Sequence, residues 1–194
     1  MILQPIVEGH GEVHAVPTLL HRVCSALGAP AVVVKPPIRM HRSQLVIKNG
    51  LEGSIRMARL RRDLGGIVVI LDADDDCPKE AAPRLSGWAK AAAAPIACEV
   101  VLANREFEAW FLGGLEGLRR ARWIRPDAVL PADPESVRDA KGAFDGLLDL
   151  GRTYLPTVDQ KRLAGLFDLE RAADRCRSFR RLKSALRSIL DRAA

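Results

Sequence analysis

An uninterrupted apolar run, Gly66–Leu71 (GIVVIL), constrains the fold more than any other segment of the sequence. A strand that is apolar at every position has both faces buried, which is typical of a parallel sheet with helices on both sides. Other short apolar segments predict further strands, and helical patterns separate them. The predicted strands are Ile2–Val7, Ala31–Val34, Gly66–Leu71 and Ile96–Ala103. Their β-α-β-α-β-α-β order predicts an α/β fold with a mostly parallel sheet of about four strands.

The segments between these strands show helical spacing or helix breakers. The first helix is expected to start near Val13–Val16, because Pro17 fits only the first turn of a helix, and to end at Gly28. Lys35–Gln44 contains two prolines and predicts a loop. Helices are also expected at Leu51–Leu64, with Leu60 facing inward, and at Pro78–Ala94.

No strand is predicted after Asn104, and the rest of the sequence indicates helices. The last predicted helix, Ser178–Asp191, has one apolar face. That face carries Phe179, Leu182, Leu186 and Ile189. We therefore expect an α/β core at residues 1–112 and a C-terminal helical extension at residues 113–194, packed on the core.

Charge is distributed unevenly along the chain. The formal net charge is +6, yet residues 35–62 carry +7, residues 171–194 carry +6, and the remainder is acidic. Two basic segments indicate a polyanion such as DNA or RNA as a partner, because each neutralised phosphate releases counterions. The alternative is that these arginine-rich helices are simply solvated.

Composition excludes several classes of protein. No run of 18 apolar residues occurs, so no membrane-spanning helix is expected, and no secretory signal is recognisable in MILQPIVEGHGE. The four cysteines form no CxxC pair, which argues against a zinc ribbon or a disulfide scaffold. No GxxxxGK[ST] loop for ATP occurs. We expect a cytoplasmic protein with no membrane partner and no organic cofactor.

Acidic side chains follow two of the predicted strands. Glu8 ends the first strand, with Glu12 four residues later, and Asp72 and Asp74 follow the third strand. Open α/β sheets bind ligands at the carboxyl ends of their strands, and alternate residues of an extended segment point to one side. Asp72, Asp74 and Asp76 are therefore expected to converge. Crowded carboxylates repel one another, and Mg²⁺ relieves that repulsion. The alternative is an exposed acidic loop that caps the next helix.

These motifs resemble the signature of Toprim domains. The matching residues are Val7-Glu8-Gly9 and Asp72-x-Asp74, and the spacing of Glu8 and Glu12 is similar to that in nucleases of the overcoming-lysogenization-defect (OLD) family. The whole chain more closely resembles a bacterial Toprim-like family of domains of unknown function, family 4276. The stretches that carry this resemblance are Val7–Pro17, Leu71–Pro78, Leu102–Leu112, Tyr154–Gln160 and Ser178–Leu182.

The resemblance implies catalytic and metal-binding roles for the acidic residues and for one lysine. Glu8 would act as general acid/base, and Lys141 would stabilise phosphate charge in the transition state. The implied ligands of Mg²⁺ or Mn²⁺ are Glu8, Glu12, Asp72, Asp74, Asp76, Glu106 and Glu108, with Glu12 at a second ion and Asp76 as a spare carboxylate.

The implied chemistry is phosphodiester hydrolysis by a Toprim-type nuclease, with two ions roughly 4 Å apart. Arginine matches phosphate geometry. The candidate phosphate contacts are Arg39, Arg42, Arg180 and Arg181. For Ser178–Leu182 an alternative stays open, a packing helix with Ser178 as its N-cap. A topoisomerase is not expected, because the chain's one tyrosine, Tyr154, lies in a short helical tail.

Two other functions stay open. In the first, the chain is a non-catalytic or partner-activated subunit that binds nucleic acid or docks on an ABC-type ATPase, because Toprim-like families of this kind resemble phage-defence effectors. In the second, Asp72-x-Asp74 holds a metal under a nucleotide-sugar, as in DxD transferases. Those enzymes usually need a longer chain, and they give no role to Glu8. A second copy of this chain is a further candidate partner.

Overall fold

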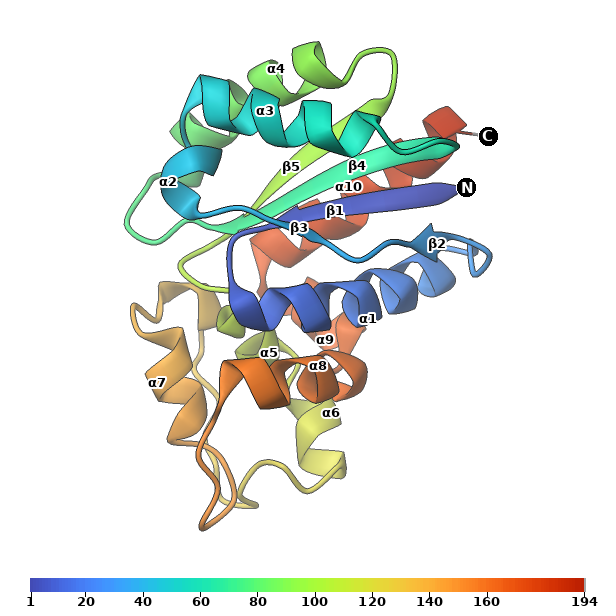
Figure 1. Cartoon of the computed structure of the whole chain (residues 1–194). Helices are drawn as coiled ribbons and strands as arrows, with labels where there is room; N and C mark the ends of the chain where they lie inside the picture. The colour runs from blue at the N-terminus through green and yellow to red at the C-terminus, as the bar shows by residue number, and fades with distance from the viewer. Residues whose placement is uncertain (194) are drawn as a thin grey trace.

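A parallel five-stranded sheet forms the centre of the computed structural model, which describes residues 1–193 (Figure 1). The main path has the order β2-β1-β4-β5, and β3 also pairs with β1. All of these pairings are parallel, as the sequence predicts. The strands are β1 (Ile2–Val7), β2 (Val33–Val34), β3 (Ile38–Arg39), β4 (Leu64–Asp72) and β5 (Ala97–Ala103).

The segment Lys35–Gln44, expected to be a loop, contains regular structure. Ile38 and Arg39 pair with the end of β1, and the short helix α2 (Arg42–Leu45) follows. The His41 ring accepts a hydrogen bond from the Ser43 N–H at the start of α2, and Leu45 is buried. Pro36 and Pro37 therefore do not prevent the short strand β3, because a strand at the edge of a sheet needs few main-chain N–H donors.

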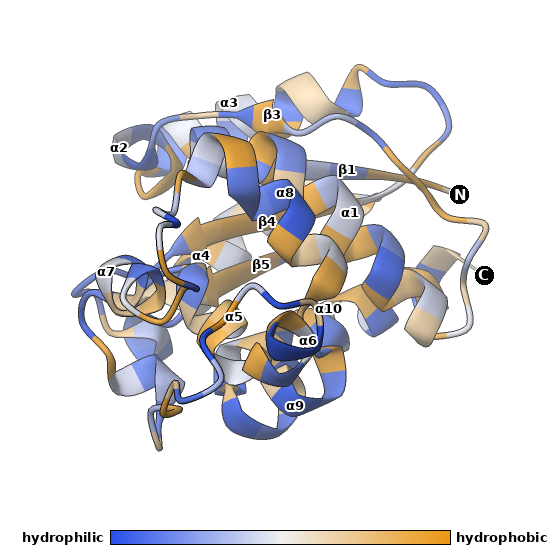
Figure 2. Cartoon of the chain, turned by 90° about the horizontal axis from the view of Figure 1, so that it is seen from below, coloured by the Kyte–Doolittle hydropathy of each residue, from blue (hydrophilic) through white to orange (hydrophobic). Residues whose placement is uncertain are grey.

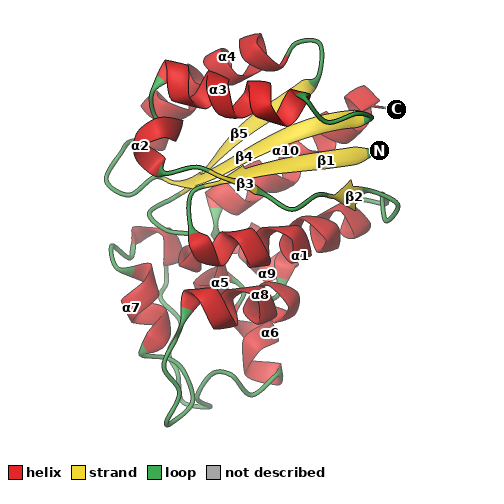
Figure 3. Ribbon diagram, in the orientation of Figure 1, coloured by secondary structure: helices red, strands yellow, loops and turns green. Residues whose placement is uncertain are grey.

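Helices cover both faces of the sheet (Figure 3). On one face, α3 (Lys48–Arg59) and α4 (Pro78–Ala93) pack on alternate strand residues such as Ile67 and Val69. On the other face, α1 (His10–Ala26) and α10 (Arg177–Ala193) pack on the alternate set, including Val68 and Ile70. A view from below shows the apolar strands β4 and β5 enclosed by helices (Figure 2).

Several helix boundaries differ from the prediction, most clearly the start of α1 and the end of α3. Helix α1 begins at His10, before Val13–Val16, and has Pro17 in its interior. The Glu12 side chain accepts hydrogen bonds from the N–H groups of Glu8 and Gly9, which fixes this earlier start. Helix α3 ends at Arg59, and Leu60 is 83% exposed instead of facing inward.

The remaining helices pack beneath α1 around an aromatic core. Phe111 contacts Phe107, Phe144 and Phe167, and Phe179 of α10 contacts Trp110 and Phe167. Helix α8 packs along α1. The elements of this region are α5 (Glu108–Gly113), α6 (Leu115–Arg120), the 3₁₀ helix η1 (Pro134–Ser136), α7 (Ala140–Asp145), α8 (Pro156–Leu166) and α9 (Leu169–Arg175).

Helix α10 packs both on the sheet and on the helical region. Its apolar face is buried as predicted, and Gly66 of β4 leaves the space that Ile189 fills. The N-cap expectation for Ser178 is wrong. The Glu135 carboxylate accepts from the N–H groups of Arg177 and Ser178, both at 2.8 Å, and the Ser178 hydroxyl accepts from Trp110 Nε1. In residues 1–193, no helix has the length and apolarity needed to cross a membrane.

Candidate metal centre

Three carboxylates meet at the carboxyl edge of the sheet. Glu8 follows β1 and Asp72 ends β4, and these adjacent parallel strands leave the sheet at the same edge because Val7 pairs with Ile70. Glu12 lies in the first turn of α1. One oxygen atom from each of the three carboxylates lies within 4.8 Å of the other two. We call Glu8, Glu12 and Asp72 the acidic triad.

The acidic triad contains oxygen atoms without partners. Glu8 Oε2 and Asp72 Oδ1 are both shielded from solvent and accept no hydrogen bond from residues 1–193. Glu12 differs, because its Oε2 accepts from the N–H groups of Glu8 and Gly9, each at 3.3 Å. Buried oxygen atoms that lack a donor are costly, and a cation is one of the few groups that satisfy several of them at once. The donor set therefore fits a hard divalent cation such as Mg²⁺ or Mn²⁺.

Burial and mutual repulsion shift the acidity of the triad. The pKa of Glu12 is raised to about 8, chiefly by burial, and the nearby charges of Glu8 and Glu108 contribute to this rise. Burial also raises the pKa of Asp72 well above its ordinary range, with Glu12 and Glu8 adding to the effect. The pKa of Glu8 is raised by burial and lowered by the positive charge of Arg42. A bound divalent cation would favour the deprotonated form of all three carboxyl groups.

Glu108, a predicted ligand, lies beside the triad in a buried hydrogen-bonded cluster. Its Oε1 accepts from the Tyr154 hydroxyl at 2.8 Å and from Gln160 Nε2 at 3.4 Å. All three side chains are buried, and the charge of Glu108 raises the pKa of Asp72. Sequence reasoning assigned no role at this edge to Tyr154 or Gln160. The signal was present, because both lie in the Tyr154–Gln160 stretch that resembles family 4276.

Glu106 and Lys141 lie next to this cluster but outside the triad. Glu106 Oε2 accepts from the main-chain N–H of Lys141 at 2.8 Å, which supports the first turn of α7. The Lys141 side chain is exposed, and its charge lowers the pKa of Glu108. Both residues are therefore close enough to act on charge at this edge, because the charge of Glu106 raises the pKa of Glu108. Glu106 also supports the start of α7, whose N-cap is Asp139.

Asp74 and Asp76 lie outside the acidic triad, although the charge of Asp74 still raises the pKa of Asp72 and of Glu8. The chain turns at Asp74, whose φ of 50° lies in the left-handed region. Alternation of side chains therefore ends after Asp72. Arg42 binds both displaced carboxylates, with Nε 3.0 Å from Asp74 Oδ2 and Nη2 bonded to Asp76 Oδ2.

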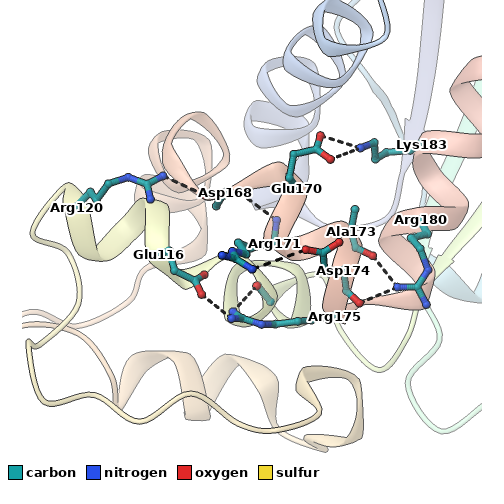
Figure 4. Close-up of polar contacts among 11 residues, drawn as sticks. Glu116, Arg120, Asp168, Glu170, Arg171, Ala173, Asp174, Arg175, Arg180 and Lys183 are labelled. Carbon is teal, nitrogen blue, oxygen red and sulfur yellow. Dashed lines mark hydrogen bonds and ion pairs between the residues drawn. The ribbon is translucent and has the colours of Figure 1, made fainter.

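The four arginines predicted to contact phosphate have different surroundings. Arg39 is exposed beside the triad, with one 3.4 Å hydrogen bond to the Glu8 carbonyl. Arg42 is bound to the acidic loop, and Arg181 donates to Glu99 at 2.6 Å. Arg180 donates to the carbonyls of Ala173 and Asp174, as Figure 4 shows.

The basic segment at residues 171–194 makes several other internal contacts. Lys183 pairs with Glu170, and Arg175 pairs with Glu116 (Figure 4). Arg180, Arg181, Lys183 and Arg175 thus connect elements of the chain. The sequence suggested that these positive charges bind nucleic acid. In the structure, their partners are carboxylates and carbonyls of the chain itself.

One known protein family matches this chain. The profile of the domain of unknown function DUF4276 matches residues 7–187, which include the whole acidic triad and most of α10. The chain belongs to the DUF4276 family. No curated protein and no solved structure gives a significant match. In this DUF4276 chain, the chemistry of the acidic edge is therefore the feature that points to a function.

Proposed function

We propose that this DUF4276 protein is a metal-dependent phosphodiester hydrolase that acts on DNA or RNA, with a centre related to that of Toprim and OLD-type nucleases. The observation that carries the proposal is the acidic triad, with its two buried, partnerless oxygen atoms on Glu8 and Asp72. Two carboxylates at the carboxyl ends of parallel strands and a third from the first turn of α1 form the kind of site where phosphate-bearing substrates meet Mg²⁺.

Each residue of the edge has a distinct part in this proposal. Asp72 and Glu8 would hold the ion through their partnerless oxygen atoms, and Glu12 is already oriented by two main-chain N–H groups. A bound Mg²⁺ or Mn²⁺ would supply Lewis-acid catalysis and lower the pKa of a water molecule. Glu8 is the least buried member of the triad, and the opposite charges of Arg42 and Asp74 both act on it. It is therefore the candidate to accept a proton from that water.

Phosphate contacts in this proposal come from the cations that remain exposed near the triad. Arg39 lies next to Glu8, and Lys141 lies near Glu108. Both side chains are exposed, and neither forms a salt bridge within residues 1–193, so we assign the scissile phosphate to Arg39 and Lys141. Arg180 and Arg181 are assigned to the fold instead, because both donate to other parts of the chain.

The proposal predicts cleavage by the purified full chain with Mg²⁺ or Mn²⁺. Plasmid DNA, single-stranded DNA and total tRNA would each be tested with the wild type, Glu12→Gln and Asp72→Asn. A suitable control is Glu170→Gln, because Glu170 is exposed on α9 and contacts Lys183 far along the sequence from the triad. We expect Asp72→Asn to lose at least 100-fold in rate, in line with the loss of a group that stabilises transition-state charge. Normal cleavage by this variant would contradict the site assignment.

The same experiment distinguishes an enzyme from a docking subunit. A chain that binds Mn²⁺ through the triad but cleaves none of the substrates would favour the partner-activated alternative. The proposed partner in that case is an ATPase subunit of a phage-defence complex. Co-purification of such a subunit, followed by cleavage only in the complex, would support that alternative.

A further inference from the structure

The carboxylates at the strand ends fall into two groups with different partners. No lysine or arginine of residues 1–193 forms a salt bridge with the acidic triad. Asp74 and Asp76, which we call the outer pair, both contact Arg42. The two-ion centre that the resemblance implied had Glu12 at its second ion and counted Asp74 and Asp76 among its ligands, so the outer pair would have to be open to a metal. The structure has a guanidinium there.

Main-chain hydrogen bonds hold Arg42 in addition to its ion pairs. Nη1 donates to the Asp72 carbonyl at 2.7 Å, and Nη2 lies 3.3 Å from the Ala73 carbonyl. The side chain of Arg42 is only 22% exposed. Its planar group therefore spans the end of β4 and the outer pair at once, which a flexible lysine could not do.

A second divalent ion would compete directly with this arrangement. It would bind the carboxylates of Asp74 and Asp76, and Arg42 already contacts the Oδ2 atom of each. Arg42 would have to leave and lose two main-chain hydrogen bonds, or remain and repel the ion at short range. The guanidinium also acts on the triad, because its charge lowers the pKa of Glu8.

We infer that the centre binds a single divalent cation, at the acidic triad, and that Arg42 stands in the place of a second ion. This inference rests on the proposed function. Arg42 is a positioning residue: its bond to the Asp72 carbonyl holds Asp72 at the triad, and its charge offsets the outer pair. Asp74 and Asp76 are then partners of Arg42 and do not bind the ion.

The number of Mn²⁺ ions bound per chain tests this inference without any need for activity. Isothermal titration of the full chain, checked by electron paramagnetic resonance of free Mn²⁺, should give one ion for the wild type. Asp76→Asn should also bind one ion, with a Kd within about threefold, whereas Asp72→Asn should weaken binding at least tenfold. Two ions in the wild type, with one lost in Asp76→Asn, would overturn the inference and leave the proposed hydrolase intact. No ion in the wild type would overturn both.

Substitution of Arg42 supplies the reciprocal test. Arg42→Gln frees the outer pair, so a second, weaker Mn²⁺ should appear. Arg138→Gln is the matched control, because Arg138 is 77% exposed and contacts the neighbouring Asp75 instead of the outer pair. One ion at wild-type affinity in a folded Arg42→Gln protein would contradict the role of Arg42. If Arg42→Gln does not fold, Arg42→Lys replaces it, because lysine keeps the charge but cannot span the end of β4 and the outer pair. A second, weaker Mn²⁺ is expected in this variant as well.

Discussion

Individual carboxyl groups at the acidic edge differ because their hydrogen-bond donors differ. Glu12 receives two main-chain N–H groups and still has a pKa of about 8, so burial outweighs those donors. Glu108 is as deeply buried but has a phenol and an amide as partners. Asp72 has a partnerless oxygen and the charges of its neighbours. A cation would therefore satisfy the partnerless oxygen atoms of Asp72 and Glu8 and would favour the deprotonated form of Glu12.

The raised pKa of Glu12 predicts how stability depends on pH without a metal. Between the ordinary pKa of 4.5 and about 8, the folded protein holds a proton that the unfolded chain has released. The free energy of unfolding therefore falls as pH rises through this range. From pH 6 to pH 8 we expect a loss of about 2 kcal/mol, or about 4–8 °C in Tm. Differential scanning calorimetry in the presence of a chelator would measure it.

Glu12→Gln is the control for this pH prediction, because it removes the titrating group and keeps the shape. The decline between pH 6 and pH 8 should be much smaller in this variant. Saturating Mn²⁺ should raise Tm in the wild type more at pH 8 than at pH 6, since bound metal requires the carboxylate form. Equal pH dependence in both proteins would show that Glu12 does not titrate in this range.

Tyr154 provides a second residue-scale prediction. Tyr154→Phe removes the hydroxyl that donates to Glu108 Oε1 and leaves the ring packed on Phe144. Because Glu108 then keeps only the long contact from Gln160, its carboxylate should move or take up a proton. We expect Mn²⁺ affinity to fall by about tenfold, as for other groups that orient metal ligands. Titration calorimetry would measure the Kd, and an unchanged value would separate Glu108 from the metal centre.

At the scale of elements, the contact between α1 and α8 positions the site. Helix α1 carries Glu12, and α8 carries Gln160, so their separation decides whether Glu108 and the triad stay together. A Cβ atom on Gly11 would overlap Gln160 Oε1 and lie 2.9 Å from the Pro156 carbonyl oxygen. Gly11 is thus required for close helix packing at this point.

Gly11→Ala should therefore separate the two helices locally. We expect a loss of about 1–3 kcal/mol in the free energy of unfolding, typical of overpacking, together with weaker Mn²⁺ binding. The matched control is Gly165→Ala in α8, where the nearest atom to the added Cβ is Thr18 Cγ2 at 3.7 Å. That variant should be neutral or more stable by up to about 1 kcal/mol, because alanine favours helix. Urea denaturation of both variants would test the difference, and equal stabilities would argue against a tight contact at Gly11.

The long elements were predictable from the sequence, whereas their ends were not. The strands β1 and β4 follow from apolar runs that only a covered parallel sheet can bury. The start of α1 was missed because it depends on the Glu12 side chain bonding back to Glu8 and Gly9. Leu60 was misplaced because a helical spacing does not say where the helix ends.

At the site, the proximity of Glu8 and Asp72 was predictable, because adjacent parallel strands end at the same edge of a sheet. The contacts of Asp74 were not predictable, because they depend on its own left-handed backbone conformation and on Arg42, which is distant in sequence. The contribution of Tyr154 and Gln160 likewise comes from helical packing between segments that are far apart in sequence. Whether Asp74, Asp76 and Glu106 bind metal stays a prediction.

At the scale of the whole molecule, the two-part division at residue 112 stays a prediction, but α10 connects the two parts. It covers β4 and β5 from the far end of the chain, and its Phe179 joins the aromatic core beneath α1. Folding of the sheet and of the helical region should therefore be coupled. The acidic edge lies where these regions meet, because Glu108 begins α5 while Asp72 ends β4.

Removal of residues 177–194 should therefore abolish cooperative folding and not merely weaken nucleic-acid binding. Phe179, Leu182, Leu186 and Ile189 are each at most 1% exposed. Burial of each such side chain contributes about 1.5–3 kcal/mol, so their combined loss is comparable to the whole stability of a domain, about 5–15 kcal/mol. Near-ultraviolet circular dichroism and urea denaturation of residues 1–176 should show no cooperative transition. Arg187→Gln in the full chain, which lies on the exposed side of the same helix, should unfold like the wild type. A folded 1–176 fragment would mean that the sheet is stable without its α10 cover, and that the basic C-terminal helix is free to act as a separate binding element.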